Sequence, residues 1–326
     1  MEAILAQAIK DTLALRKASV PWNGDEPYAQ PYFTFDAAQS SWVPKPPVSN
    51  GAQNENSQSI TNVALYTWNI DFMLPFPEGR MKSALDHLDG LTSSKHVPLS
   101  TACVIFLQEC TPSDLTTIAA QPWVRERFHL TDLDSTNWAT THYGTTTLVD
   151  SRLPITAAFR VHYSKTQMDR DALFSDVSIG PDGQKMKLVA GYMHEEHVYA
   201  ALTAGDFNAI QPFDRTLHVD GDNNLKDAFL ETGGKEDSEE GYTWGQQAAT
   251  KLRDQFGCSR MDKVYYCGAV KLIKFTRFGE DVTLKSEEDG RKIMELGFEK
   301  PWVTDHLGVM AEFRVTSRAA MGFSLR

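Results

Sequence analysis

Short apolar runs that end in polar side chains recur from residue 62 to residue 315. Each has the length and the β-branched or aromatic content of a buried strand, and segments with helical spacing lie between some of them. The clearest runs are NVALYTWNI, ACVIFLQEC, TTTLVD, ITAAFRVHY, ALFSDVSI, VYAALTAGDFN, RMDKVYYCGAVKLIKFTRF and LGVMAEFRV, and the clearest helical segments are GRMKSALDHLDGL, SDLTTIAAQPWVRERF and NLKDAFLETGG. Strands with interspersed helices, several strands being adjacent, predict an α/β (α+β) protein with two packed mixed sheets and helices outside.

The first sixty residues differ in composition from the rest. Apolar residues in 1–18 recur at nearly helical spacing, whereas 21–59 is rich in Pro, Asn, Gln and Ser. The latter segment also carries six Trp, Tyr and Phe residues, which is unusual for a disordered chain. We therefore expect residues 1–60 to form a helix and an extended arm whose first half docks on the body, with a flexible stretch at 49–59. Residues 61–326 should form the main domain.

Composition restricts the partners and the compartment. The net charge of −11 argues against coating of duplex DNA, which needs many cations, although one phosphate or one DNA end remains compatible with it. No apolar run approaches the roughly 20 residues of a membrane helix, and the N-terminus lacks a secretory pattern. Four cysteines without a Cys-x-x-Cys pair favour a reduced, intracellular protein without a zinc site. We expect a monomer, nuclear or cytoplasmic.

Polar residues gather at the ends of the predicted strands. Taken singly, a carboxylate at a strand end is more often a solvated or turn-forming residue. Taken together, carboxylate and amide oxygens from several strands suit a hard cation such as Mg²⁺ or Mn²⁺, and a histidine beside them can contact a phosphate. The set comprises Asn69, Asp71, Glu109, Asp206, Asn208, Asp262, Asp305 and His306.

These blocks, in this order, resemble the signature blocks of the endonuclease/exonuclease/phosphatase superfamily. The likeness runs from about residue 62 to residue 315 through TWNID, LQE, GDFN, TWG, RMDKVYY and TDHLGV. Within the superfamily it is strongest to the tyrosyl-DNA phosphodiesterase 2 group. The resemblance implies a four-layer α/β/β/α sandwich and a Mg²⁺-dependent phosphoric diester hydrolase that cleaves tyrosine from a DNA 5′ end.

The resemblance also implies roles for single residues. Glu109 would be the principal metal ligand, supported by Asn69 and Asp305. Asp206 would orient or deprotonate the attacking water, and Asn208 would position the water and the phosphate.

Three further residues complete the implied site. His306 would contact the phosphate, with Asp262 fixing its ring. Trp244 matches an aromatic on which the family lays a base or backbone, but an ordinary core tryptophan is an equal alternative.

The stretch SDVSIGPDGQKMKLVAGYMHEEH, residues 175–197, departs from the family pattern. The family has a strand here that ends in a block like Asn/Ser-Thr/Ser-His-Leu-Glu-Ser, whose histidine is a second phosphate contact, and no such block occurs. From residue 184 the sequence resembles the helix that follows that strand, with Met186, Val189 and Met193 on one face. We therefore expect one strand to be missing near residue 184. The alternative is a hairpin in which KMKLV is the second strand. His194 and His197 are interpreted as part of a solvated helix end.

The departure leaves three explanations open. A coding segment has been skipped and the full protein is active, or this form is real and impaired, or the sheet is rearranged and the chain is a binding module. The alternatives to tyrosyl-DNA hydrolysis are therefore another small-phosphoester phosphatase of the same fold and a catalytically dead binder.

Overall fold

The computed structural model describes residues 10, 14–48, 59–166, 168–180, 183–191, 199–220 and 224–316. Its strands form two sheets. One sheet contains β2 (Tyr32–Asp36), β3 (Ser41–Lys45), β4 (Asn62–Asn69), β5 (Thr101–Cys110), β6 (Phe128–Leu130), β7 (Gly144–Asp150), β14 (Val270–Phe278) and β15 (Gly308–Val315), in the order β14-β15-β4-β5-β7-β6-β2-β3. The other contains β1 (Pro27–Ala29), β8 (Ile155–His162), β9 (Asp171–Ile179), β10 (Gln184–Ala190), β11 (Ala200–Asp206), β12 (Lys226–Asp227) and β13 (Asp262–Gly268), in the order β1-β8-β9-β10-β11-β13-β12.

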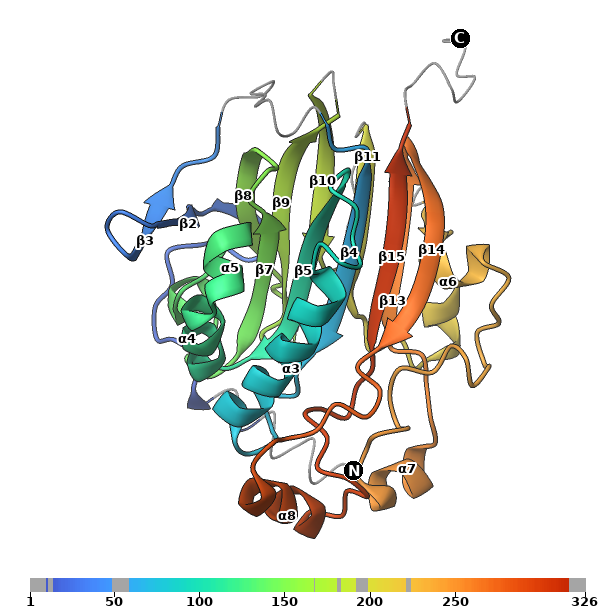
Figure 1. Ribbon diagram of the computed structural model, residues 1–326. Helices are drawn as coiled ribbons and strands as arrows, with labels where there is room; N and C mark the ends of the chain where they lie inside the picture. Colours follow the sequence, from blue (N-terminus) through green and yellow to red (C-terminus); the bar gives the residue numbers. More distant parts are fainter. Residues whose placement is uncertain are drawn as a thin grey trace.

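Both sheets are mixed, as predicted, because β4 and β5 run parallel in one, β10 and β11 run parallel in the other, and antiparallel pairs complete both. Helices α3 (Pro77–Thr92), α4 (Pro112–Ala120) and α5 (Pro122–Arg127) cover the outer face of the eight-stranded sheet (Figure 1). A proline at the first turn opens each of these three helices, where a missing N–H costs nothing. The other helical segments are α6 (Ala228–Glu231), α7 (Thr250–Phe256), α8 (Glu287–Glu295) and the 3₁₀ turns η1 (Ser135–Asn137) and η2 (Pro212–Arg215).

Two apolar cores hold the layers together. The larger lies between the sheets, where side chains such as Phe106 and Leu188 are fully buried. The second joins the eight-stranded sheet to its helices through residues such as Leu85 and Ile105. On the outer face of the seven-stranded sheet, the segment after β11 packs through His218, whose ring stacks on Tyr265 at 5.2 Å.

The segment near residue 184 corrects one expectation. Residues 184–190 form the strand β10, not a helix, so no strand is missing at this place. Met186 pairs antiparallel with Val177 of β9 and parallel with Ala200 of β11, which confirms the hairpin alternative. The helical interpretation was wrong because apolar spacing over so short a segment fits a helix or a strand, and the hydrogen-bonding partners that β9 and β11 supply to 184–190 favour the strand.

The connection that follows β10 is short. The nine residues 191–199 join two parallel strands, whereas such crossovers commonly need a dozen or more residues. The departure from the family pattern therefore lies in this connection and not in the sheet. Met193, His194 and His197 lie outside the described residues.

The N-terminal arm contributes to both sheets. β1 pairs with β8 at the edge of the seven-stranded sheet, and β2 pairs with β6 at the edge of the other. Gln30, between β1 and β2, is buried and donates to the carbonyl of Thr131 at 2.8 Å. Most of the expected helix at 1–18 and most of the stretch at 49–59 lie outside the described residues. Among the helices that the structure describes, none is both long and apolar enough to cross a membrane.

Candidate functional site

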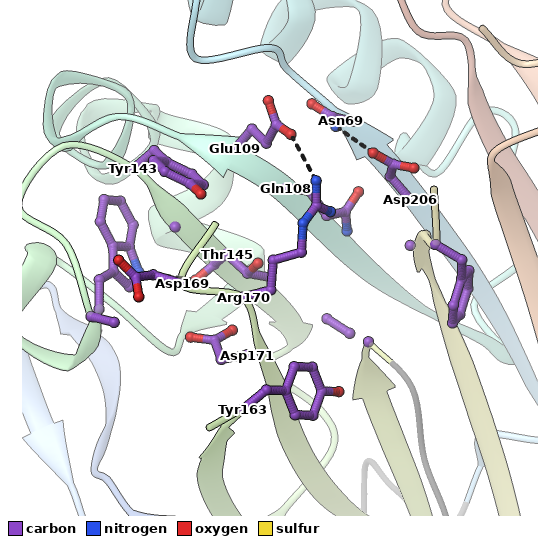
Figure 2. A pocket seen from close by; sticks show the side chains of 17 residues that line it. Asn69, Gln108, Glu109, Tyr143, Thr145, Tyr163, Asp169, Arg170, Asp171 and Asp206 are labelled. Atoms are coloured by element: carbon purple, nitrogen blue, oxygen red, sulfur yellow. Dashed lines mark hydrogen bonds and ion pairs between the residues drawn. The ribbon is translucent and has the colours of Figure 1, made fainter. Parts of the chain in front are cut away.

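The ends of the inner strands meet at one end of the sandwich. β4 ends at Asn69, β11 ends at Asp206, and Asp262, the first residue of β13, is the Cα partner of Asp206. Because β4 and β5 are parallel, Glu109 near the end of β5 reaches the same edge. Of the eight residues to which the resemblance assigns a role, Glu109, Asp206, Asn208, Trp244, Asp305 and His306 line one cleft of about 620 Å³. Asn69 lines an adjoining cavity of about 170 Å³ with Glu109 and Asp206 (Figure 2).

Backbone strain marks three positions at these strand ends. Asp71, Glu109 and Asn208 adopt positive φ angles of 56°, 56° and 47°. Such angles are rare for residues other than glycine and cluster at functional sites. The register of β5 against β7 also shifts between Leu107 and Cys110, so that a bulge turns Glu109 out of the regular ladder.

Asp206 is held by the two predicted amides. Its Oδ2 accepts hydrogen bonds from Asn69 Nδ2 at 3.0 Å and from Asn208 Nδ2 at 2.8 Å. Its Oδ1 accepts from the backbone N–H of Asn208 at 2.8 Å. Three donors therefore fix the carboxylate in one orientation.

His306 and Asp262 form a buried pair. The Nδ1 of His306 lies 2.8 Å from Asp262 Oδ2, and its Nε2 lies 3.8 Å from Asp305 Oδ1. Burial by itself lowers the pKa of His306, but Asp262 and then Asp305 more than offset this and raise the pKa well above the usual value. The ring is therefore held as an imidazolium that can donate a hydrogen bond from Nε2.

Negative charge accumulates around this pair. Burial, together with neighbouring carboxylates, raises the pKa of Glu109 and of Asp71 to about 7. Burial also raises the pKa of Asp305. Carboxylates crowded in a buried site favour a cation among them.

The donor set fits a divalent cation. Ligand atoms of Asp206, Asp262 and His306 lie within 4.8 Å of one another, and Asp262 Oδ1 is buried without a hydrogen-bond partner. This trio differs from the predicted ligands Asn69, Glu109 and Asp305. An imidazolium bonded to Asp262 is a poor ligand, so the oxygen atoms on the side of Glu109 and Asp206 suit Mg²⁺ or Mn²⁺ better.

Trp244 has a contact that neither sequence interpretation included. Its indole Nε1 donates to Asp305 Oδ2 at 2.7 Å, and its backbone bridges to His306 and Ser259. The ring is half-buried at the cleft wall. Trp244 therefore orients a site carboxylate in addition to offering an aromatic surface.

Two arginines of the site were missed. Arg170, just before β9, projects into the smaller cavity, and its Nη2 lies 4.0 Å from Glu109 Oε1 (Figure 2). Arg80 of α3 is fully buried and donates to the carbonyl of Asp71 at 2.9 Å and to that of Val303 at 2.7 Å, which ties two site loops together. A single arginine before a strand or in a helix gives no sequence signal of such a role.

Comparison with known proteins gives a family and a fold. Residues 66–306 match the model of the endonuclease/exonuclease/phosphatase family. Truncated TDP2 from Caenorhabditis elegans is 21% identical, with a TM-score of 0.56 over 78% of this chain and 98% of that one. D. rerio TDP2 complexed with a single-strand DNA product is 17% identical, with a TM-score of 0.57 over 78% and 99%. A Bacteroides vulgatus endonuclease/exonuclease/phosphatase is 13% identical, with a TM-score of 0.52 over 78% and 99%.

Among curated proteins, none matches significantly. The family model spans most of the chain and includes every one of the eight predicted site residues. The structural neighbours share the two-sheet fold, and TDP2 is the group that the motifs resemble. The chain belongs to the endonuclease/exonuclease/phosphatase family.

Proposed function

We propose that the chain hydrolyses a phosphodiester bond with the help of Mg²⁺ or Mn²⁺ bound in this cleft. The observation that carries the proposal is the fixed carboxylate of Asp206, which lies in the same cleft as Glu109 and the His306–Asp262 pair. Such a reaction requires a general base, a cationic hydrogen-bond donor and oxygen ligands for a metal ion, and Asp206, His306 and Glu109 could supply them.

Each residue has a separate task. Glu109, with Asn69 and Asp305, would hold the metal, which offsets negative charge on the phosphate oxygens. Asp206 accepts a proton from the attacking water, and Asn208 orients that water. His306 donates from Nε2 to a phosphate oxygen while Asp262 holds its Nδ1.

Arg170 adds positive charge where the family's second histidine is lacking. Its guanidinium lies beside Glu109 and lines the cleft that holds Asp206. A fixed cation here can contact a phosphate oxygen as the missing imidazole would.

The leading substrate is an ester between tyrosine and a DNA 5′ end, supported by the resemblance to TDP2. Glu109→Gln and Asp206→Asn should each lower hydrolysis of a 5′-phosphotyrosyl oligonucleotide by about 10²–10⁴. EDTA should abolish hydrolysis and Mg²⁺ should restore it. Glu299→Gln, an exposed carboxylate paired with Arg253, is the matched control and should keep full activity. Activity that survives both site changes contradicts the proposal.

Two alternatives have distinct outcomes. A phosphatase acting on another small phosphoester would cleave bis-p-nitrophenyl phosphate but not the oligonucleotide. A binding module would bind Mn²⁺ or the DNA end without turnover, and a histidine-containing insertion into residues 191–199 should then create activity. A monomer remains a prediction, which light scattering after gel filtration would test.

A further inference from the structure

We infer that the cleft recognises an uncharged aromatic substituent on a single phosphate, and that it contributes little binding to a polynucleotide chain. The inference rests on the proposed function, because it names the substrate class of the same site.

The charges that line the cleft do not suit a polyanion. A strand of DNA is bound chiefly through Lys and Arg contacts to successive phosphates. Among the residues that the structure describes, the cleft is instead lined by twice as many carboxylates as arginines, namely Asp71, Glu109, Asp206, Glu236, Asp237 and Asp305 against Arg170, Arg215 and Arg260.

Each of these arginines is already engaged with a carboxylate. Arg215 donates to both carboxylate oxygens of Asp237 at 2.8 Å. Arg260 is fully buried, 2.8 Å from Asp227 and in contact with Glu236.

Arg170 is the third, 4.0 Å from Glu109. It lines the same cavity as Asp206, where one scissile phosphate would bind. The lining therefore supplies cationic contacts for one phosphate and not for a row of them.

Apolar side chains make up much of the remaining wall. Met73, after β4, is 60% exposed, and Ile210, after β11, is 57% exposed, and both line the cleft. Large apolar groups left in water beside a polar site are typical of a surface that binds an apolar ligand.

The composition of this wall favours an aromatic ligand. The aromatic residues Trp244 and Phe256 line the cleft, and so do Met168 and Met261. Rings pair with rings, and methionine sulfur makes favourable contacts with aromatic edges while adapting to irregular shapes. A cleft of about 620 Å³ is large enough for one such group.

The test holds the leaving group constant and varies the other substituent. Methyl, phenyl and naphthyl esters of p-nitrophenyl phosphate all release p-nitrophenolate, so kcat/KM reports recognition of the second group. Burial of an aromatic ring should raise kcat/KM about 10- to 100-fold from methyl to naphthyl. Lengthening a 5′-phosphotyrosyl oligonucleotide from one to ten nucleotides should raise kcat/KM by less than about threefold, with weak salt dependence.

Variants at the wall sharpen the test. Ile210→Ser and Met73→Ser should lower the naphthyl-to-methyl ratio of kcat/KM several-fold. Leu99→Ser is the matched control, because Leu99 is 80% exposed and lies outside the cleft. It should leave the ratio unchanged.

The possible outcomes distinguish a failure of this inference from a failure of the proposed function. If the esters are cleaved but the ratio is near one, or the longer oligonucleotide gains tenfold or more, the inference is overturned while the proposed function stands. If none of the esters or oligonucleotides is cleaved with Mg²⁺ present, the proposed function is overturned and the inference with it.

Discussion

Replacement of Trp244 by phenylalanine tests whether this tryptophan acts through its ring or through its indole N–H. Phenylalanine keeps an aromatic surface on the cleft wall but removes the donor to Asp305 Oδ2, which lies at 2.7 Å. The backbone bridges of residue 244 to Ser259 and His306 need no side chain and should persist.

The expected cost follows from the nature of this bond. A hydrogen bond to a charged group contributes about 1.5–3 kcal/mol, which corresponds to about 10- to 150-fold in an equilibrium or rate. Because Asp305 is proposed to support the metal, the loss should appear as a higher Mg²⁺ concentration at half-maximal activity together with a lower kcat/KM. Partners that orient metal ligands commonly cost 10–100-fold when they are removed.

The assay is a Mg²⁺ titration of hydrolysis for the wild type, Trp244→Phe and Trp244→Ala. Trp302→Phe is the matched control, because Trp302 Nε1 donates to Asp281 at 3.3 Å outside the cleft. If the N–H matters, both changes at Trp244 should impair activity to a similar degree. If Trp244→Phe stays within about twofold of the wild type while Trp244→Ala loses activity, the ring alone matters and the reasoning is refuted.

Two further predictions concern stability. Arg160→Met should lower the free energy of unfolding by about 3–5 kcal/mol in urea titrations, because buried Arg160 lies 2.7 Å from Asp132 and 2.8 Å from Asp171, and both carboxylates would lose its charge. The control Arg253→Met, at an exposed ion pair, should lower the free energy of unfolding by less than about 1 kcal/mol. Equal losses of stability in the two variants would contradict the argument. Burial lowers the pKa of His129 to about 4, so the unfolded chain takes up a proton near pH 6.5 and the folded chain only near pH 4. As the pH falls from about 6.5 to about 4, the free energy of unfolding of the wild type should decrease by on the order of 3 kcal/mol more than that of His129→Gln. If the free energies of unfolding of the two proteins change in parallel with pH, this prediction is refuted.

The strand-end pattern was informative because it depends on local rules. An apolar run that ends in a polar residue places that residue at a sheet edge, and parallel neighbours share that edge. Asn69, Glu109 and Asp206 were therefore predicted to converge, and they line adjoining cavities in the structure. Their chemical roles stay proposals.

The segment at residue 184 shows where such rules fail. In β10, Met186 and Leu188 alternate with Lys185 and Lys187, but Met186 and Val189 also fit a helical spacing, so this short pattern allowed either a helix or a strand. Only its two neighbours, β9 and β11, decided between them, because a strand is stabilised by hydrogen bonds to partners distant in sequence.

The sequence by itself determined the two-sheet architecture and the order in which polar groups reach its edge, since both depend on short-range patterns. Tertiary structure alone decided that Arg170 lies beside Glu109, that the indole of Trp244 binds Asp305, and that exposed apolar residues such as Met73 and Ile210 line part of the cleft. These contacts join segments separated by dozens of residues or more. Their energies depend on burial and distance, which no local pattern encodes.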